Sequence, residues 1–131
     1  MKAQLKGLSG AQGALNKVAG RLEGATEGML TTMLMAISAQ TNPFVPVDTS
    51  ALINSEKRSV RKEGDKIVAS ISYGGEGTNA RGTPVQEYAI YVHEGPQKNW
   101  QKPGASNLFL ARGTDNFLRD DLSRIMAQFK L

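Results

Sequence analysis

The sequence predicts an α+β fold, and three segments carry that prediction. Residues 9–40 repeat apolar side chains at steps of three and four, which is the spacing of an amphipathic helix. Residues 55–73 alternate apolar and polar side chains around a short glycine-containing loop, which is typical of a β-hairpin. Residues 107–130 return to helical spacing. The 131 residues are enough for one core, and we assign residues 1–131 to a single domain.

The composition is that of an ordinary globular protein, with 40% hydrophobic and 21% charged residues. Because the chain has no cysteine, disulfides, thiol nucleophiles and cysteine-bound metals are excluded. No signal-peptide pattern follows Met1, and no apolar run approaches the roughly 18 residues of a membrane span, so we expect a soluble protein made in the cytoplasm. The net charge of +4 permits contact with nucleic acid without demonstrating it.

The N-terminal part is expected to consist of a loose arm, residues 1–8, and a long helical segment. The helical stripe consists of Leu15, Val18, Leu22, Ala25, Met29, Met33 and Ile37. An unbroken helix over residues 9–40 would be about 48 Å long, which exceeds the width of a compact domain of this size. Gly20, Gly24 and Gly28 recur at four-residue spacing. Two interpretations stay open: a weak helix kinked near Gly20, or a helix that packs in an assembly.

A corner rich in turn signals, residues 43–55, follows this helix. Pro43 and Pro46 end the helix because proline lacks an amide N–H and disfavours helical backbone in the preceding residue. The polar residues 48–50 are candidates to cap a short helical turn, which Leu52 would anchor in the core. We therefore expect this corner to redirect the chain into the hairpin.

The hairpin is predicted from two alternating segments joined at residues 63–65. Its second strand places one set of side chains on a single face: Ile67, Ala69, Ile71 and Tyr73. Residues 56–66 hold five positive and three negative side chains. We interpret this run as a solvated hairpin face, with a surface that faces DNA or an acidic partner as the alternative.

Two loops separate the hairpin from the last helix. Residues 74–84 contain four glycines and predict a long irregular loop that orders against a partner. This loop lacks the helix and the Lys-Ser/Thr pair of phosphate-binding loops. Residues 85–95 are rich in aromatic and β-branched side chains and predict a strand, with one helical turn at its start as an option. After a second loop at residues 95–106, we expect the last helix to begin properly only at Thr114 or Asp115.

The sequence predicts no catalytic, cofactor-binding or metal-binding residues. His93 is the only histidine, so a metal site would need carboxylates from distant parts of the chain. Asp120 and Asp121 are adjacent in a predicted helix and point apart, so they do not form a carboxylate pair. No serine or threonine has an identifiable base. We expect a protein that is not an enzyme, with a site assembled from distant residues as the alternative.

Three motifs, taken in order, carry a resemblance to a known family. Residues 46–55, Pro-Val-Asp-Thr-Ser-Ala-Leu-Ile-Asn-Ser, match a proline-valine-aspartate-threonine-glycine corner that is followed by a leucine and a serine. Residues 88–95, Tyr-Ala-Ile-Tyr-Val-His-Glu-Gly, match a tyrosine-alanine, valine, glutamate, glycine pattern after a hairpin. Phe109-Leu110 matches a phenylalanine-leucine pair before a final helix. By their order and spacing, residues 9–128 resemble the head–tail joining or tail-completion proteins of tailed bacteriophages, which are minor virion proteins of the neck.

The sequence departs from the family pattern at particular points. Ser50 stands where glycine is usual, which bears on the turn geometry of the corner. Gly95-Pro96 stands where glycine-threonine is common, and the loop of residues 74–84 is long.

The resemblance implies a small antiparallel β-sheet packed by a long N-terminal helix and a C-terminal helix. It also implies a structural virion protein, made in the host cytoplasm, that forms a ring in the head–tail connector around the DNA channel. Its partners would be copies of itself and portal, adaptor or tail proteins, without a membrane or a cofactor. Non-specific contact with packaged DNA would follow if the positive charges face the channel. The alternatives are a nucleic-acid-binding accessory protein and a minor capsid protein bound elsewhere on the shell.

The candidate interface residues are Arg81, His93, Glu94 and Trp100. They lie in the two predicted loops or at the end of the predicted strand, and arginine and aromatic side chains are frequent anchors of protein interfaces. We expect them to contact neighbouring subunits or other neck proteins.

Overall fold

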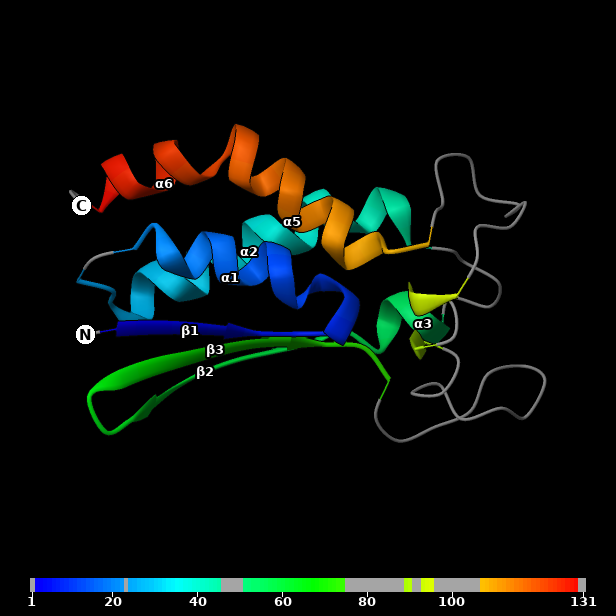
Figure 1. Ribbon diagram of the computed structural model, residues 1–131, viewed down its shortest axis with the longest axis horizontal. Coiled ribbons are helices and arrows are strands. Elements are labelled where there is room, and N and C mark those ends of the chain that lie inside the picture. Colours follow the sequence, from blue (N-terminus) through cyan, green and yellow to red (C-terminus); the bar gives the residue numbers. More distant parts are fainter. Residues whose placement is uncertain are drawn as a thin grey trace.

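The computed structural model places helices on a β-sheet (Figure 1). The described residues are 2–22, 24–45, 51–74, 89–90, 93–95 and 107–129. Its elements are β1 (Lys2–Lys6), η1 (Ser9–Ala11), α1 (Gln12–Gly20), α2 (Glu27–Thr41), η2 (Asn42–Phe44), α3 (Ala51–Asn54), β2 (Lys57–Glu63), β3 (Lys66–Ser72), α5 (Phe109–Asp120) and α6 (Leu122–Gln128). The predicted α+β class is confirmed: helices cover one face of a three-stranded sheet.

The predicted hairpin is present and forms two of the three strands. Strands β2 and β3 pair antiparallel, and Gly64 in the turn between them has a φ of 62°, a conformation that glycine adopts without steric cost. The predicted inner set on β3 is buried, with Ile67 and Ile71 at 1% exposure or less. On β2, only Val60 is not exposed, in agreement with a solvated hairpin.

The prediction of a loose N-terminal arm is wrong, because residues 2–6 form β1. This strand pairs parallel with β3, so the sheet has the order β1-β3-β2 and is mixed rather than wholly antiparallel. Leu5 anchors β1 in the core with 1% of its surface exposed. The arm is therefore held by backbone pairing along β3 and by one buried leucine.

The predicted long helix is divided into α1 and α2. Gly24 has a φ of 64° in the connection, and the Thr26 side chain then caps α2 by accepting a hydrogen bond from the Met29 N–H at 3.2 Å. The predicted helix is therefore interrupted between Gly20 and Glu27 and is not one kinked helix. A side chain at Gly20 would meet no atom within 4 Å, and one at Gly28 would meet only a ring carbon of Phe129 at 3.8 Å. Neither Gly20 nor Gly28 therefore brings another backbone close within the described chain.

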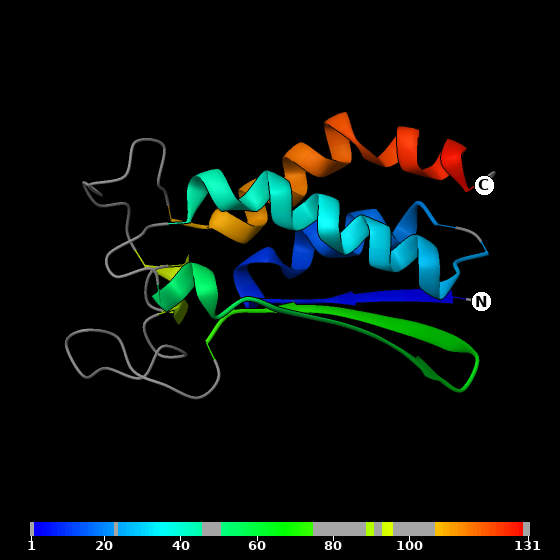
Figure 2. The ribbon, with the colours of Figure 1, turned by 180° about the vertical axis from the view of Figure 1, so that it is seen from behind.

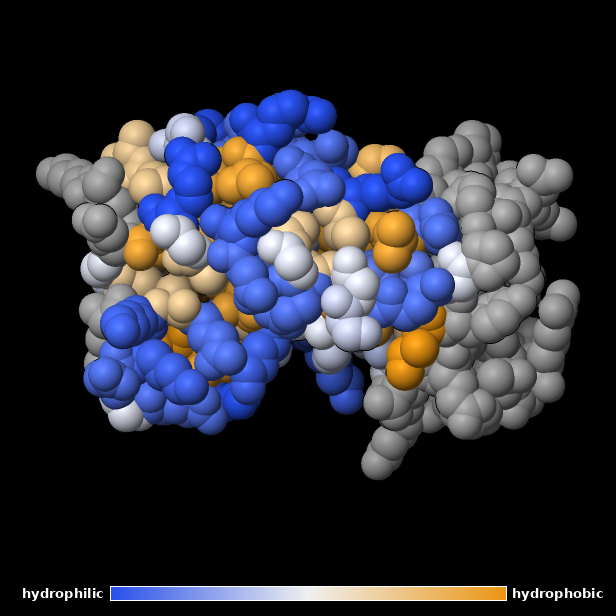
Figure 3. All heavy atoms as spheres, viewed as in Figure 1, coloured by the Kyte–Doolittle hydropathy of each residue, from blue (hydrophilic) through white to orange (hydrophobic). Residues whose placement is uncertain are grey.

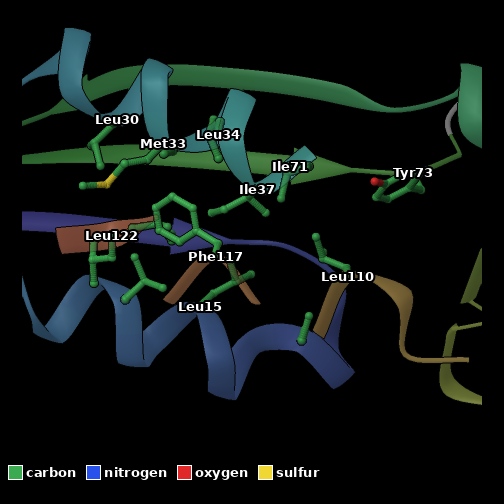
Figure 4. Close-up of a cluster of buried hydrophobic side chains, with 14 of the residues drawn as sticks. Leu15, Leu30, Met33, Leu34, Ile37, Ile71, Tyr73, Leu110, Phe117 and Leu122 are labelled. Carbon is green, nitrogen blue, oxygen red and sulfur yellow. The ribbon is translucent and has the colours of Figure 1, made fainter. Parts of the chain in front are cut away.

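The helices form two layers above the sheet (Figures 1 and 2). Helix α1 packs against β1 and α2 packs against β2 and β3, whereas α5 and α6 lie over these two helices on the side away from the strands. Side chains from all three layers meet in one core (Figure 4). Phe117 of α5 lies at its centre and has no exposed surface. The C-terminal helix thus completes the core by covering α1 and α2, and its Phe109 ring meets the ring of Tyr73 at the end of β3, with centroids 5.1 Å apart.

The contact between α2 and α5 depends on Gly113. A Cβ atom at this position would lie 2.6 Å from the Cα atom of Thr41, so the two helix backbones leave no room for a side chain. Gly113 lies inside α5, which begins at Phe109 rather than at Thr114 or Asp115 as predicted. The glycine that suggested a late helix start is explained by close helix packing. A separate break at Asp121 divides α5 from α6.

The prediction of a strand over residues 85–95 is wrong for the residues that the structure describes. Ala89, Ile90, His93 and Glu94 are helical. Ala89 and His93 have no exposed surface, whereas Ile90 and Glu94, each one residue further on, are exposed. Buried and exposed positions therefore repeat every four residues, which is a helical period.

Candidate functional site

The carboxylate of Glu94 joins two parts of the chain that are far apart in sequence. It accepts hydrogen bonds from the backbone N–H of Gly10 at 2.6 Å and from the hydroxyl of Ser9 at 3.2 Å. A Cβ atom at Gly10 would lie 2.9 Å from the carboxylate carbon, so glycine leaves the space that the carboxylate occupies. Since η1 begins at Ser9, Glu94 holds the start of the N-terminal helical segment against residues 93–95.

His93 is buried beside this contact. Its ring meets the ring of Phe109 edge-on, with centroids 4.8 Å apart, and its backbone carbonyl accepts from the Leu108 N–H at 2.9 Å. The Nδ1 atom lies 3.4 Å from Oε2 of Glu94, but neither ring nitrogen forms a hydrogen bond with a described residue. Burial lowers the pKa of His93, and the nearby Glu94 carboxylate only partly offsets that effect. The imidazole is therefore neutral near pH 7.

Glu94 remains ionised in this arrangement. Partial burial favours its neutral form, but the Gly10 N–H, the neighbouring His93 and the Ser9 hydroxyl together hold the pKa of Glu94 below its usual value. A carboxylate that already accepts two hydrogen bonds and a buried neutral imidazole provide a structural clamp.

Two of the four candidate interface residues, His93 and Glu94, lie within the described part of the chain. His93 has 0% exposed surface, so it has no side-chain surface to offer a partner. Glu94 keeps 30% of its side chain exposed, but its carboxylate is engaged within the chain. Arg81 and Trp100 lie outside the described residues, as do Asp48 of the corner and residues 75–84 of the glycine-rich loop.

A second polar cluster, which sequence reasoning missed, lies where the corner enters the hairpin. The Glu56 carboxylate accepts from the Ser38 hydroxyl at 2.7 Å and from the Tyr73 hydroxyl at 3.0 Å. Nε of Arg58 lies 3.2 Å from the same carboxylate, and only 11% of the Glu56 side chain is exposed. Burial, followed by the charge of Glu56 and the hydrogen bond to it, raises the pKa of Tyr73 above its usual range, so the phenol stays a donor. Glu56 thereby connects α2, β2 and the end of β3.

The corner itself behaves as predicted where it is described. Residues 51–54 form the short helix α3, and Leu52 is 2% exposed. The Ser55 hydroxyl donates to the Leu52 carbonyl at 2.6 Å and accepts from the Gly74 N–H at 2.9 Å. Together with Glu56, this serine closes the joint between the corner and the hairpin.

The described part of the chain contains no cluster of three or more histidine, cysteine, aspartate or glutamate side chains suited to a metal ion. A hollow of about 220 Å³ lies between the start of η1 and the end of β3, beside Ile71, Tyr73 and Ile90. Its volume is below the roughly 300 Å³ of the smallest typical small-molecule pockets. None of the described helices has the length and apolar character needed to cross a bilayer.

Comparisons of this chain with protein-family models, with curated proteins and with solved structures returned no match.

Proposed function

We propose that this protein is a structural subunit of a tailed-phage virion that forms a ring in the neck, joining head to tail around the DNA channel. The observation that carries the proposal is the order of the three motifs along residues 9–128. In the fold, these motifs fall at three structural joints: α3 with its entry into the hairpin, the Glu94 contact, and the start of α5.

The Glu94 contact gives the second motif a physical role. Its glutamate binds the backbone of Gly10 and the hydroxyl of Ser9, more than 80 residues earlier in the chain. The third motif begins with Phe109 and Leu110, which both have no exposed surface. Motif residues that hold the fold together, rather than performing chemistry, suit a subunit whose function is to assemble.

A ring requires a subunit that binds its neighbour through two different surfaces, and the ring closes when the rotation between subunits divides a full turn. We expect the purified full chain, or the chain in particles, to appear as rings with a central channel in negative-stain electron microscopy. The direct test is gold-labelled antibody against this chain, applied to tailed particles produced from the genome that encodes it.

Label at the head–tail junction supports the proposal. Label distributed over the shell would assign the chain to a minor capsid protein instead. Particles without any label, together with a chain that remains monomeric at high concentration, would overturn the proposal.

A further inference from the structure

The face of the sheet opposite the helices is rich in positive charge. Strand alternation and register place one set of cations from all three strands on it: Lys2, Lys6, Lys57, Arg61 and Lys66. We call this set the basic face. The assignment follows from the burial pattern, because Leu5, Ile67 and Ile71 point to the helices and the cations occupy the alternate positions.

The basic face accounts for the whole charge excess of the protein. Among the described strands, one carboxylate shares it, that of Glu63. Five cations minus one carboxylate give +4, and the formal net charge of the complete chain is also +4. The rest of the chain is therefore balanced, so the excess charge is concentrated on the sheet.

The cations of the basic face are also less neutralised than those on the other side of the same strand. On the helix side, Arg58 lies 3.2 Å from Glu56, and Lys62 lies 3.7 Å from Glu27. On the basic face, Arg61 lies 3.2 Å from Glu63. Its four lysines form no ion pair with any residue in the described ranges, so their charges are available to a ligand.

The side chains between the cations indicate which polyanion fits. They are hydroxyls and an amide, Gln4, Ser59, Ser70 and Ser72, with a valine that has no exposed surface, Val68. Hydroxyl and amide groups are common donors to phosphate oxygens. The strands place no aromatic side chain there on which unpaired bases could stack, and no exposed apolar side chain that would enter a bilayer. Phosphate contact without base contact is the chemistry that remains.

The dimensions of the basic face match a nucleic-acid backbone. Three strands span about 10 Å, and the cations extend over about 20 Å along the strands. A duplex carries one phosphate charge for each roughly 1.7 Å of its axis, so each cation has a phosphate within reach. Figure 3 shows the sheet from its edge, and the hairpin end, at the lower left, is mostly hydrophilic.

We infer that the basic face binds the phosphate backbone of duplex DNA without reading its sequence. The inference goes beyond the proposed neck function and does not depend on it, because binding can be measured on the purified chain whether or not a ring forms. In a ring, the basic face is the surface that would turn toward the channel.

The test measures binding of a fluorescein-labelled DNA duplex of arbitrary sequence by anisotropy at several salt concentrations. Four to five phosphate contacts predict a slope of about −4 for log affinity against log salt, so affinity should fall about 250-fold between about 50 and about 200 mM salt. The variant K57Q/R61Q removes two cations from the basic face, and its slope should be about −2.

The matched control is R58Q/K62Q, which removes one arginine and one lysine from the helix side of the same strand. It has the same net charge as K57Q/R61Q, and it should retain the wild-type slope. Cooperative thermal unfolding followed by circular dichroism, with a native-like spectrum at the temperature of the binding assay, should show that both variants fold.

Three results would overturn the inference. The first is absence of wild-type binding at about 50 mM salt, where backbone contacts are strong. The second is an equal loss of slope in both variants, which would indicate a general charge effect. The third is equally tight binding of poly-glutamate with the same dependence on Lys57 and Arg61, which would assign the basic face to an acidic polypeptide partner. None of these results bears on ring formation, which the antibody label tests separately.

Discussion

Each side of strand β2 carries one lysine and one arginine, but the two pairs have different surroundings. Arg58 and Lys62 point to the helix side and lie beside carboxylates of Glu56 and Glu27. Lys57 and Arg61 point to the opposite side, where Glu63 is the one carboxylate that the strands supply. A shift of one residue in the strand register would exchange the two sets. Register, rather than composition, therefore decides whether a cation belongs to the internal network or is available to a partner.

The two faces of β3 differ in burial. Substitutions on these faces give the largest expected difference in stability. Ile71 has no exposed surface, whereas Ser72, the next residue, is exposed. Ile71→Ala should lower the free energy of unfolding by about 2–5 kcal/mol, because it removes buried methyl groups and leaves a cavity. Ser72→Ala should change it by less than about 0.5 kcal/mol. Urea unfolding of both variants measures the difference, and equal losses would show that the two faces of β3 have been assigned wrongly.

The second comparison uses two carboxylates at opposite ends of β2. Glu56→Ala should lower the free energy of unfolding by about 2–4 kcal/mol, because the Ser38 and Tyr73 hydroxyls lose their acceptor in a buried position. Glu63 pairs with Arg61 on the exposed face, so Glu63→Ala should cost less than about 1 kcal/mol. Thermal unfolding of the two variants under the same buffer separates them. A Glu56→Ala loss no larger than that of Glu63→Ala would exclude the buried network.

The buried His93 makes the stability of the fold depend on pH. Its pKa is lowered in the fold, so the unfolded chain binds more protons just below its usual value of about 6.5. Its contribution to stability is complete above that pH and is lost as the pH falls toward the lowered value. The loss should approach about 1.4 kcal/mol for each pH unit. Because the chain has a single histidine, no other imidazole contributes in this range.

The measurement is urea unfolding of the wild type and of His93→Phe between about pH 7.5 and about pH 5.5, the range in which histidine titrates. Phenylalanine retains an aromatic ring beside Phe109 and removes the titrating group. The variant should show a flat dependence where the wild type loses stability. Parallel curves for the two proteins would mean that the pKa of His93 is not lowered by the fold.

The smallest expected effects concern the charges of β2 themselves. R58Q/K62Q should lower the free energy of unfolding by up to about 1 kcal/mol, because both ion pairs are partly exposed to water. K57Q/R61Q should leave it unchanged or raise it slightly at low salt, since it removes repulsion among like charges. Differential scanning calorimetry at low and high salt can resolve the sign. A larger loss of stability in K57Q/R61Q than in R58Q/K62Q would show that the charges that stabilise the fold lie on the basic face.

The elements set by local periodicity were predictable from sequence. The alternation of residues 66–73 and the glycine of the turn identified the hairpin, and the helical stripes identified α2 and α5. The break between α1 and α2 was only partly predictable, because a glycine at four-residue spacing fits both a helix face and a turn. The same ambiguity at Gly113 placed the start of α5 too late, since the reason for that glycine is Thr41 on another helix.

Strand β1 and the helical residues before Gly95 were not predictable for physical reasons. Five residues with one leucine look like a solvated arm, and only parallel pairing with a strand about 60 residues away makes them regular. Residues 85–95 have strand propensity, but burial of Ala89 and His93 in the core favours the helical period. The basic face combines cations from three strands, so no single stretch of sequence displays it.

Lysine footprinting tests the difference between the two faces most directly. The chain would be acetylated briefly at low salt with and without duplex DNA, and modification of each lysine would be measured by mass spectrometry. We predict that DNA protects Lys2, Lys6, Lys57 and Lys66, while Lys62, on the other side of the same hairpin, is modified equally in both samples. Equal protection of Lys57 and Lys62, or stronger protection of Lys62, would contradict DNA binding by the basic face.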